Sequence, residues 1–186
     1  RYMEQAAKQV EGFEIVQHTG PISHEVANQV SKLGIKKLGF EQDHLTYGTY
    51  SSYQNVLEAA EFVPVSGAVE KLRLIKSPSE IKILKEATEI ADAAFKHILT
   101  YVKPGLKEIE VANELEFFMR KNGAASSSFD IIVASGYRSA LPHGVASEKE
   151  IEKGDFVTLD FGAYYKGYCS DITRTFAVGE PKDELK

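Results

Sequence analysis

The clearest structural signal in the sequence is a helix that begins at Ser77 and continues to about Val102. Ser77 can cap the helix, Pro78 suits its first turn, and Glu80 completes a capping box. Apolar residues then recur at three- and four-residue steps: Ile81, Leu84, Ala87, Ala91, Ala94, Ile98 and Val102. A Pro-Gly pair at 104–105 ends the pattern. The sequence therefore predicts a long amphipathic helix whose apolar face another layer must cover.

The pattern differs on the two sides of this helix. Before it, short helical segments alternate with short apolar segments that favour strands, which is typical of an α/β layer. We expect helices at 2–10, 24–33 and within 46–60, and strands at 13–16, 37–40 and 62–65. After it, we expect a second helix at 108–121 and strands at 129–134, 155–162 and 168–178. We therefore place a boundary near residue 72, between a partial α/β domain (1–72) and an α+β domain (73–186).

Charge and composition argue against several classes of protein. The chain has 186 residues and a net charge of −5, which argues against a nucleic-acid partner. No apolar run approaches the roughly 18–20 residues that span a bilayer, so we expect no membrane partner. Cys169 is the single cysteine, which excludes an intrachain disulfide and favours the cytoplasm. Because the chain starts at Arg1 and stops at a predicted helix start, we expect a fragment of a longer protein.

Two aspartates lie inside predicted strands, where aspartate is disfavoured. They are Asp160 and Asp171, on the two arms of a predicted antiparallel hairpin. If the hairpin centres between Tyr165 and Lys166, the two aspartates lie directly opposite each other, with Cβ atoms roughly 4.5–5.5 Å apart. A bulge or a longer loop at the turn would change this pairing.

Two carboxylates at that separation repel each other by about 3 kcal/mol at an effective dielectric near 20. Protonation of one carboxyl group or the presence of cations relieves the repulsion. Two divalent ions about 3.5–4 Å apart match the separation, and oxygen ligands suit hard metals such as Mn²⁺. Spacing alone is equally compatible with two aspartates that face solvent or cap turns.

His143 lies in a predicted loop between Pro142 and Gly144. A loop histidine can donate to a substrate oxygen or transfer a proton. Taken alone, it is also compatible with a surface or structural role. Cys169 has no local motif of a nucleophile, and we interpret it as a packed strand residue.

Several motifs together resemble the pita-bread metallopeptidases, the M24 family of methionine aminopeptidases and Xaa-Pro aminopeptidases. The motifs are LIKSPSEI at 74–81, IVASG at 132–136, SALPHG at 139–144, and DFG at 160–162 followed by DITRTF at 171–176. The first domain resembles the second half of a creatinase-type amino-terminal domain, notably in LGFE at 38–41. The resemblance implies an α+β chain in which the first half of a pita-bread catalytic domain follows part of that domain. It favours the proline-specific branch, the Xaa-Pro aminopeptidases and dipeptidases (prolidases).

The resemblance also implies a site. Asp160 and Asp171 match the first two metal ligands of the family, and His143 matches the histidine that lies beside the substrate and stabilises the transition state. The implied cofactors are two divalent ions, Mn²⁺ first and Co²⁺ or Zn²⁺ as alternatives. The implied substrate is a peptide with proline at its second position, and the implied assembly of the full-length protein is a homodimer. The family's remaining ligands, a histidine and two glutamates, would lie beyond this chain, so we expect the fragment alone to be inactive.

Metal-free relatives are the main alternative. Creatinase-like hydrolases and peptide- or histone-binding modules resemble the same fold without a metal centre, and a non-catalytic interaction module is a third possibility. The presence of both Asp160 and Asp171 favours the metal-dependent interpretation.

Overall fold

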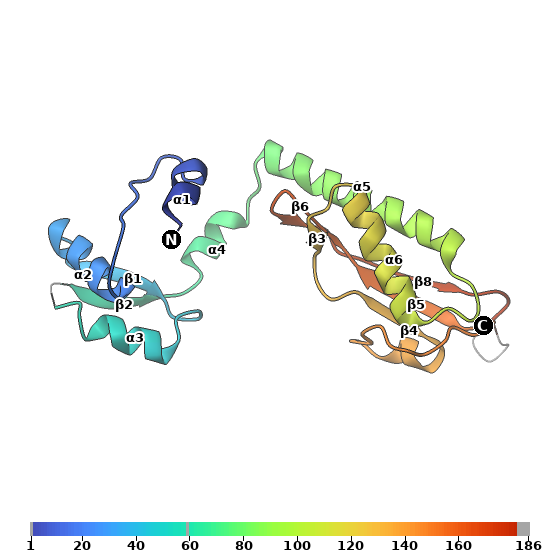
Figure 1. The fold of residues 1–186 in the computed structure, drawn as a ribbon. Helices are drawn as coiled ribbons and strands as arrows, with labels where there is room; N and C mark the ends of the chain where they lie inside the picture. Colours follow the sequence, from blue (N-terminus) through green and yellow to red (C-terminus); the bar gives the residue numbers. More distant parts are fainter. Residues whose placement is uncertain (1, 59, 182–186) are drawn as a thin grey trace. The chain divides into compact units, whose positions relative to one another are not determined.

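The computed structural model describes residues 2–58 and 60–181. The chain divides into two compact units, Arg1–Leu74 and Ile75–Lys186 (Figure 1). None of the described helices is long and apolar enough to cross a membrane.

The first unit contains two parallel strands and four helices among its described residues. These are α1 (Met3–Gln9), α2 (Ile22–Lys32), β1 (Lys37–Glu41), α3 (Tyr47–Gln54), β2 (Glu61–Val65) and α4 (Ala68–Arg73). Phe40 of β1, Phe62 of β2 and Tyr50 of α3 form an aromatic cluster, with the Tyr50 and Phe62 ring centroids 5.4 Å apart. The cluster packs α3 against the strands. The strand predicted at 13–16 is wrong, because that segment pairs with neither β1 nor β2.

The second unit begins with the long helix that the sequence predicts. Its elements are α5 (Pro78–Tyr101), α6 (Glu108–Lys121), β3 (Ser126–Ser127), β4 (Ile132–Ser135), the 3₁₀ helix η1 (Gly136–Ala140), β5 (Phe156–Phe161), β6 (Ala163–Tyr165), β7 (Tyr168–Cys169) and β8 (Ile172–Ala177). The predicted capping box is confirmed: the Ser77 side chain accepts a hydrogen bond from the Glu80 amide, and the Glu80 carboxylate accepts one from the Ser77 amide.

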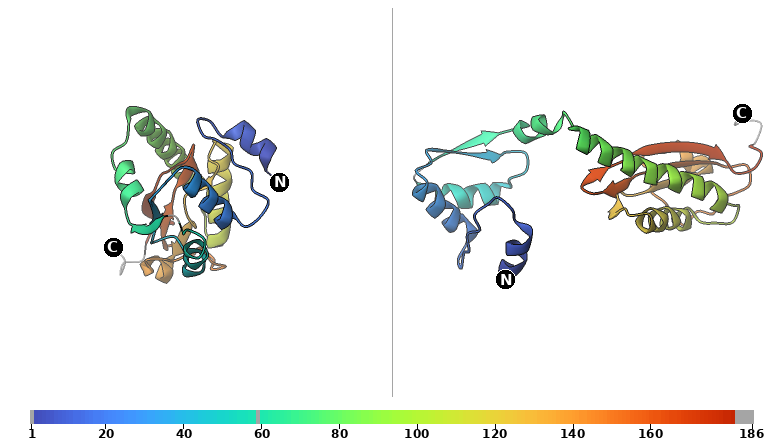
Figure 2. Two further views of the ribbon diagram at one scale, coloured as in Figure 1. Left: turned by 90° about the vertical axis from the view of Figure 1, so that its left-hand side faces the viewer. Right: turned by 90° about the horizontal axis from the view of Figure 1, so that it is seen from above.

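The core of this unit lies between the two long helices and an antiparallel sheet. Its strands run in the order β4-β5-β8, with β8 at one edge, and β3, β6 and β7 form a second small sheet. Helices α5 and α6 pack side by side over the strands (Figures 1 and 2). Large side chains from both layers are fully buried there: Ile98, Leu115, Met119, Val157, Leu159 and Phe161. This core is the layer that the amphipathic pattern of α5 requires.

Burial alternates along β5, which identifies the two faces of the sheet. Leu159 and Phe161 are buried against the helices, whereas Thr158 and Asp160 are only half-buried. Neighbours at every second position share one face of a strand. We call the face of β4-β5-β8 that carries Thr158 and Asp160 the open face.

The predicted hairpin is confirmed, but its predicted register is wrong. Asp160 pairs with Thr173 and not with Asp171. The turn residues are Lys166 and Gly167, with φ angles of 48° and 87°, and Tyr165 pairs with Tyr168. Two positive φ values identify a type I′ turn, and Gly167 supplies the second of them without strain. The turn therefore lies one residue later than the pattern indicated, which shifts the pairing by two positions.

Candidate active site

Asp160 lies on the open face among threonines. Thr173, its partner on β8, donates a hydrogen bond from Oγ1 to Asp160 Oδ1 at 3.0 Å. The next pair along the face, Thr158 and Thr175, is joined through its hydroxyl groups at 3.0 Å. The Thr173 contact orients one carboxylate oxygen of Asp160, and the Thr158–Thr175 pair adds two hydroxyl groups to the same face.

Asp171 lies immediately before β8, two residues from Thr173, and is exposed. The observed register therefore makes Asp160 and Asp171 diagonal neighbours, for which typical Cα separations are about 7–8 Å. Asp160, Asp171 and Thr173 all offer oxygen donors, and the register relates the three through β5 and the start of β8. Such a set suits hard divalent cations, so the residues present fit part of a metal site.

Two hydrogen bonds to Ser170 fix the backbone just before Asp171. The Ala163 amide donates to the Ser170 side-chain Oγ at 2.9 Å, while the Ser170 carbonyl accepts from Ser128 Oγ at 2.8 Å. Gly162 makes this arrangement possible, because a Cβ atom there would lie 1.8 Å from the Ser170 carbonyl oxygen. Four buried or half-buried residues thus fix the backbone next to Asp171: Ser128, Gly162, Ala163 and Ser170.

This close approach predicts that Gly162→Ala destabilises the second unit. The added methyl group must displace the Ser170 backbone, and overpacking of this kind costs about 1–3 kcal/mol. Urea unfolding followed by circular dichroism measures the loss. Gly48→Ala is a suitable control, because a Cβ at Gly48 in α3 meets no atom within 4 Å. Equal stability of the two variants would contradict the assigned role of Gly162.

The loop that carries His143 lies on the same open face. A Cβ atom at Gly144 would lie 2.8 Å from the Ala134 Cβ, and Ala134 pairs with Thr158. Paired residues share a face, and Thr158 shares the open face with Asp160, so Gly144 lies on the same side of the sheet as Asp160. His143 itself is exposed. The structure therefore brings the loop and the first aspartate to one face, as the chemistry of a shared site requires.

One buried carboxylate holds both ends of this loop. Glu108, at the start of α6, is fully buried and accepts five hydrogen bonds. Ser135 donates through its amide at 2.8 Å and its hydroxyl at 2.9 Å, and Ser147 donates through its amide at 3.1 Å and its hydroxyl at 2.6 Å. Arg138, inside the loop, donates Nε–H at 3.0 Å and also binds the Val145 carbonyl at 2.7 Å.

The protonation of Glu108 follows from these contacts. Burial would raise the pKa of its carboxyl group, but hydrogen bonds from Ser147 and Ser135 outweigh burial and hold the pKa below its ordinary value. The ionised form is therefore the one that the loop stabilises. Lys149 extends the network, since its ammonium group donates to Ser135 at 3.0 Å and forms an ion pair with Asp155 at 2.9 Å.

Sequence reasoning missed Glu108, although the sequence contains a signal for it. Glu108 occupies the same helical face as Val111, Ala112, Leu115 and Met119, all of them buried. A carboxylate on an apolar stripe must have buried partners, because an unpaired buried charge is very costly. The partners lie 27 to 39 residues away in sequence, so the pattern alone could not identify them.

Comparison with known proteins places both units in one family. Residues 82–186 match the model of metallopeptidase family M24, and residues 1–75 match that of the creatinase/prolidase N-terminal domain. An uncharacterized peptidase from Bacillus subtilis, YqhT, is 68% identical over 186 residues, which are 100% of this chain and 53% of the relative. An Xaa-Pro dipeptidase from Pyrococcus horikoshii is 49% identical over 153 residues, 82% of this chain and 43% of that protein.

Solved structures give the same result. An Xaa-Pro dipeptidase from Bacillus anthracis superposes with a TM-score of 0.94 at 74% identity, over 99% of this chain and 52% of that one. An X-Pro aminopeptidase from Thermotoga maritima has a TM-score of 0.87 at 39% identity, over 99% and 52%. The chain spans about half the length of these relatives. The resemblance predicted from sequence motifs is therefore confirmed: the chain belongs to metallopeptidase family M24, and it comprises a creatinase-type N-terminal domain and the start of a pita-bread catalytic domain.

Proposed function

We propose that the full-length protein is a metal-dependent exopeptidase that hydrolyses the bond between an N-terminal residue and proline. The names of the Bacillus anthracis and Pyrococcus horikoshii relatives support this specificity. The observation that carries the proposal is the sharing of the open face by Asp160 and the loop of His143, with Asp171 two positions along the partner strand.

Asp160 and Asp171 would hold part of a site for two divalent ions, with Mn²⁺ as the first candidate and Co²⁺ or Zn²⁺ as alternatives. Such ions, when bound, supply a nucleophilic hydroxide near neutral pH. The Thr173 hydroxyl keeps Asp160 in a fixed rotamer by its hydrogen bond to Oδ1. A second oxygen of Asp160 remains available to a cation.

His143 would bind the substrate. Its exposed imidazole belongs to a loop whose two ends Glu108 ties together and whose next residue, Gly144, packs against Ala134 on the open face. A ring N–H can donate to a peptide carbonyl oxygen as negative charge develops on that oxygen. The loop would thus supply a donor on the side of the sheet that carries Asp160.

The 186-residue chain alone is expected to show no Xaa-Pro peptidase activity. Among its described residues, only Asp160 and Asp171 correspond to the metal ligands that the family resemblance implies, and two carboxylates hold divalent ions weakly. The measurement is release of proline from an Xaa-Pro dipeptide in the presence of Mn²⁺, with the full-length protein as the positive control. Turnover by the 186-residue chain at the full-length rate would contradict the proposal.

We also propose that the full-length protein is a cytoplasmic homodimer. Cys169 is exposed in β7, so its interpretation as a packed strand residue is wrong, but a single free cysteine still suits a reducing compartment. The dimer follows from the family resemblance. Light scattering after size-exclusion chromatography of the full-length protein measures the assembly, and a monomeric mass would contradict it.

A further inference from the structure

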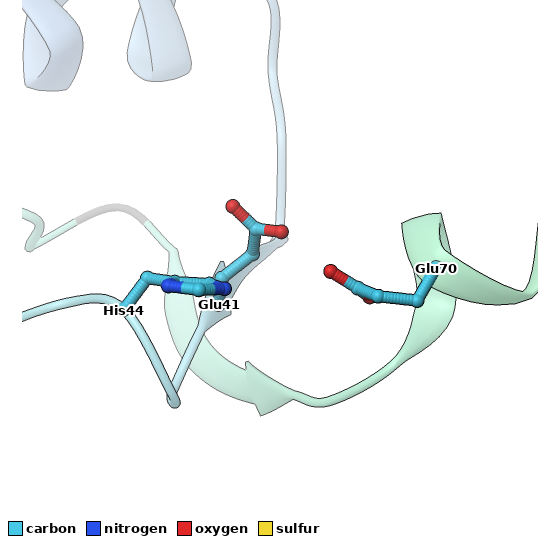
Figure 3. Close-up of side chains that lie close together, drawn as sticks. All are labelled: Glu41, His44 and Glu70. Atoms are coloured by element: carbon cyan, nitrogen blue, oxygen red, sulfur yellow. The ribbon is translucent and has the colours of Figure 1, made fainter. Parts of the chain in front are cut away.

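A second group of metal-ligating side chains lies in the first unit, whereas the open face belongs to the second unit. The side chains of Glu41, His44 and Glu70 converge at the end of β1 and the start of α4 (Figure 3). One ligand atom from each residue lies within 4.8 Å of the other two. Among the described residues, no other group of at least three His, Cys, Asp or Glu side chains meets this criterion.

Two loops at the same end of the parallel strands build this group. Glu41 is the last residue of β1, and its carbonyl accepts hydrogen bonds from the amides of His44 and Leu45, so a tight turn returns His44 towards Glu41. After β2, Gly67 adopts a φ of 64° and starts α4, whose first turn carries Glu70. Ligands commonly bind beyond the carboxyl ends of parallel strands, where such loops meet.

The two loops are also joined to each other. The Ser66 hydroxyl donates a hydrogen bond to the Asp43 carboxylate, which connects the chain after β2 to the chain after β1. A small hollow is lined by residues of both segments, and Glu41, His44 and Glu70 all border it. The hollow therefore presents the three ligand groups to one shared space.

The charges and donor types of the group indicate which ligand it would take. Two carboxylates lie close together, and Arg73 offers only a long contact of 3.9 Å to Glu70. Like charges at short distance favour a bound cation. The imidazole nitrogen selects among cations, because Mg²⁺ and Ca²⁺ prefer oxygen ligands whereas Zn²⁺ binds nitrogen and carboxylate oxygen together. Three protein ligands with a remaining open position are a common arrangement for zinc.

We propose that Glu41, His44 and Glu70 bind one divalent transition-metal ion of the Zn²⁺ type, at a site independent of Asp160 and Asp171. Ligand atoms about 2.0–2.2 Å from a tetrahedral ion lie about 3.4 Å apart, so small rotations of the exposed Glu41 and His44 side chains towards the half-buried Glu70 complete the geometry. The bound ion links the turn after β1 to α4.

Zinc titration by calorimetry tests the proposal on the 186-residue chain that carries Asp160→Asn and Asp171→Asn, which removes the carboxylates of the open face. We expect one Zn²⁺ ion to bind per chain, with an affinity that excess Mg²⁺ does not lower. His44→Asn and Glu70→Gln should each weaken binding at least about tenfold. His24→Asn, which removes another exposed histidine of the same unit, is the matched control and should bind as the parent does.

A second measurement uses the unaltered chain. Substoichiometric Zn²⁺ should shift the imidazole resonances of His44 before those of His18 or His24 in nuclear magnetic resonance spectra. The proposal would be overturned if Zn²⁺ did not bind to the chain with Asp160→Asn and Asp171→Asn. It would also be overturned if adding His44→Asn left the affinity of that chain for Zn²⁺ unchanged. Neither result would bear on the proposed peptidase, because its two metal-ligand candidates, Asp160 and Asp171, are replaced in the titrated variant and lie outside the Glu41, His44 and Glu70 group.

Discussion

Replacing Glu108 by alanine is expected to destabilise the second unit by about 3–5 kcal/mol, the usual effect of removing one partner from a buried ion pair. The substitution leaves the Arg138 guanidinium without its carboxylate and the amides of Ser135 and Ser147 without their acceptor. Urea unfolding followed by circular dichroism measures the change. Glu116→Ala on the same helix removes a surface pair with Arg120 and should cost less than about 1 kcal/mol. Similar losses in the two variants would contradict the role of Glu108.

The Glu108 carboxylate also predicts that the stability of the second unit depends on pH. Because the pKa of Glu108 is lower in the folded chain than its ordinary value of 4.5, its ionised form stabilises the fold above that value. This contribution is lost as the pH falls through the folded pKa. The difference in stability between the parent and Glu108→Gln should therefore shrink on acidification below about pH 4.5.

Asp171→Ala in the full-length protein is expected to reduce Xaa-Pro hydrolysis by more than about a hundredfold and to lower the bound metal content. Removing a hydrogen-bond partner of a metal ligand already lowers metal affinity or activity about 10–100-fold, and removing the ligand itself lowers them more. The fold should persist, because the side chain is exposed. Asp130→Ala removes an exposed aspartate before β4 and serves as the control. Full activity with unchanged metal content in Asp171→Ala would remove Asp171 from the proposed site.

Local sequence patterns predicted the parts of the fold that depend on near neighbours. The capping box at Ser77 and Glu80, the stripe along α5 and the existence of the hairpin all involve residues a few positions apart. The predicted register of the hairpin is wrong, because the register depends on which two residues form the turn. Positive φ is uncommon for a residue such as Lys166, so the Lys166-Gly167 turn was overlooked, although Gly167 was its visible signal.

The candidate site shows the same difference between what local and distant residues determine. Motifs identified Asp160, Asp171 and His143, but the side chains that position them come from distant segments. Ser128 contacts the Ser170 carbonyl across 42 residues of sequence. Periodicity carries no information about such contacts, because they arise only when the tertiary structure forms.

The position of β8 at the edge of its sheet has a consequence for the behaviour of the chain in solution. Among the described residues, β5 is its only neighbour, so the outward-facing peptide groups of Ile172–Ala177 are a template for another strand. Arg174 lies exposed in the middle of that template. Its positive charge opposes the pairing of two identical edges, and it thereby protects the chain against aggregation through β8 while leaving the edge open to a strand of complementary charge.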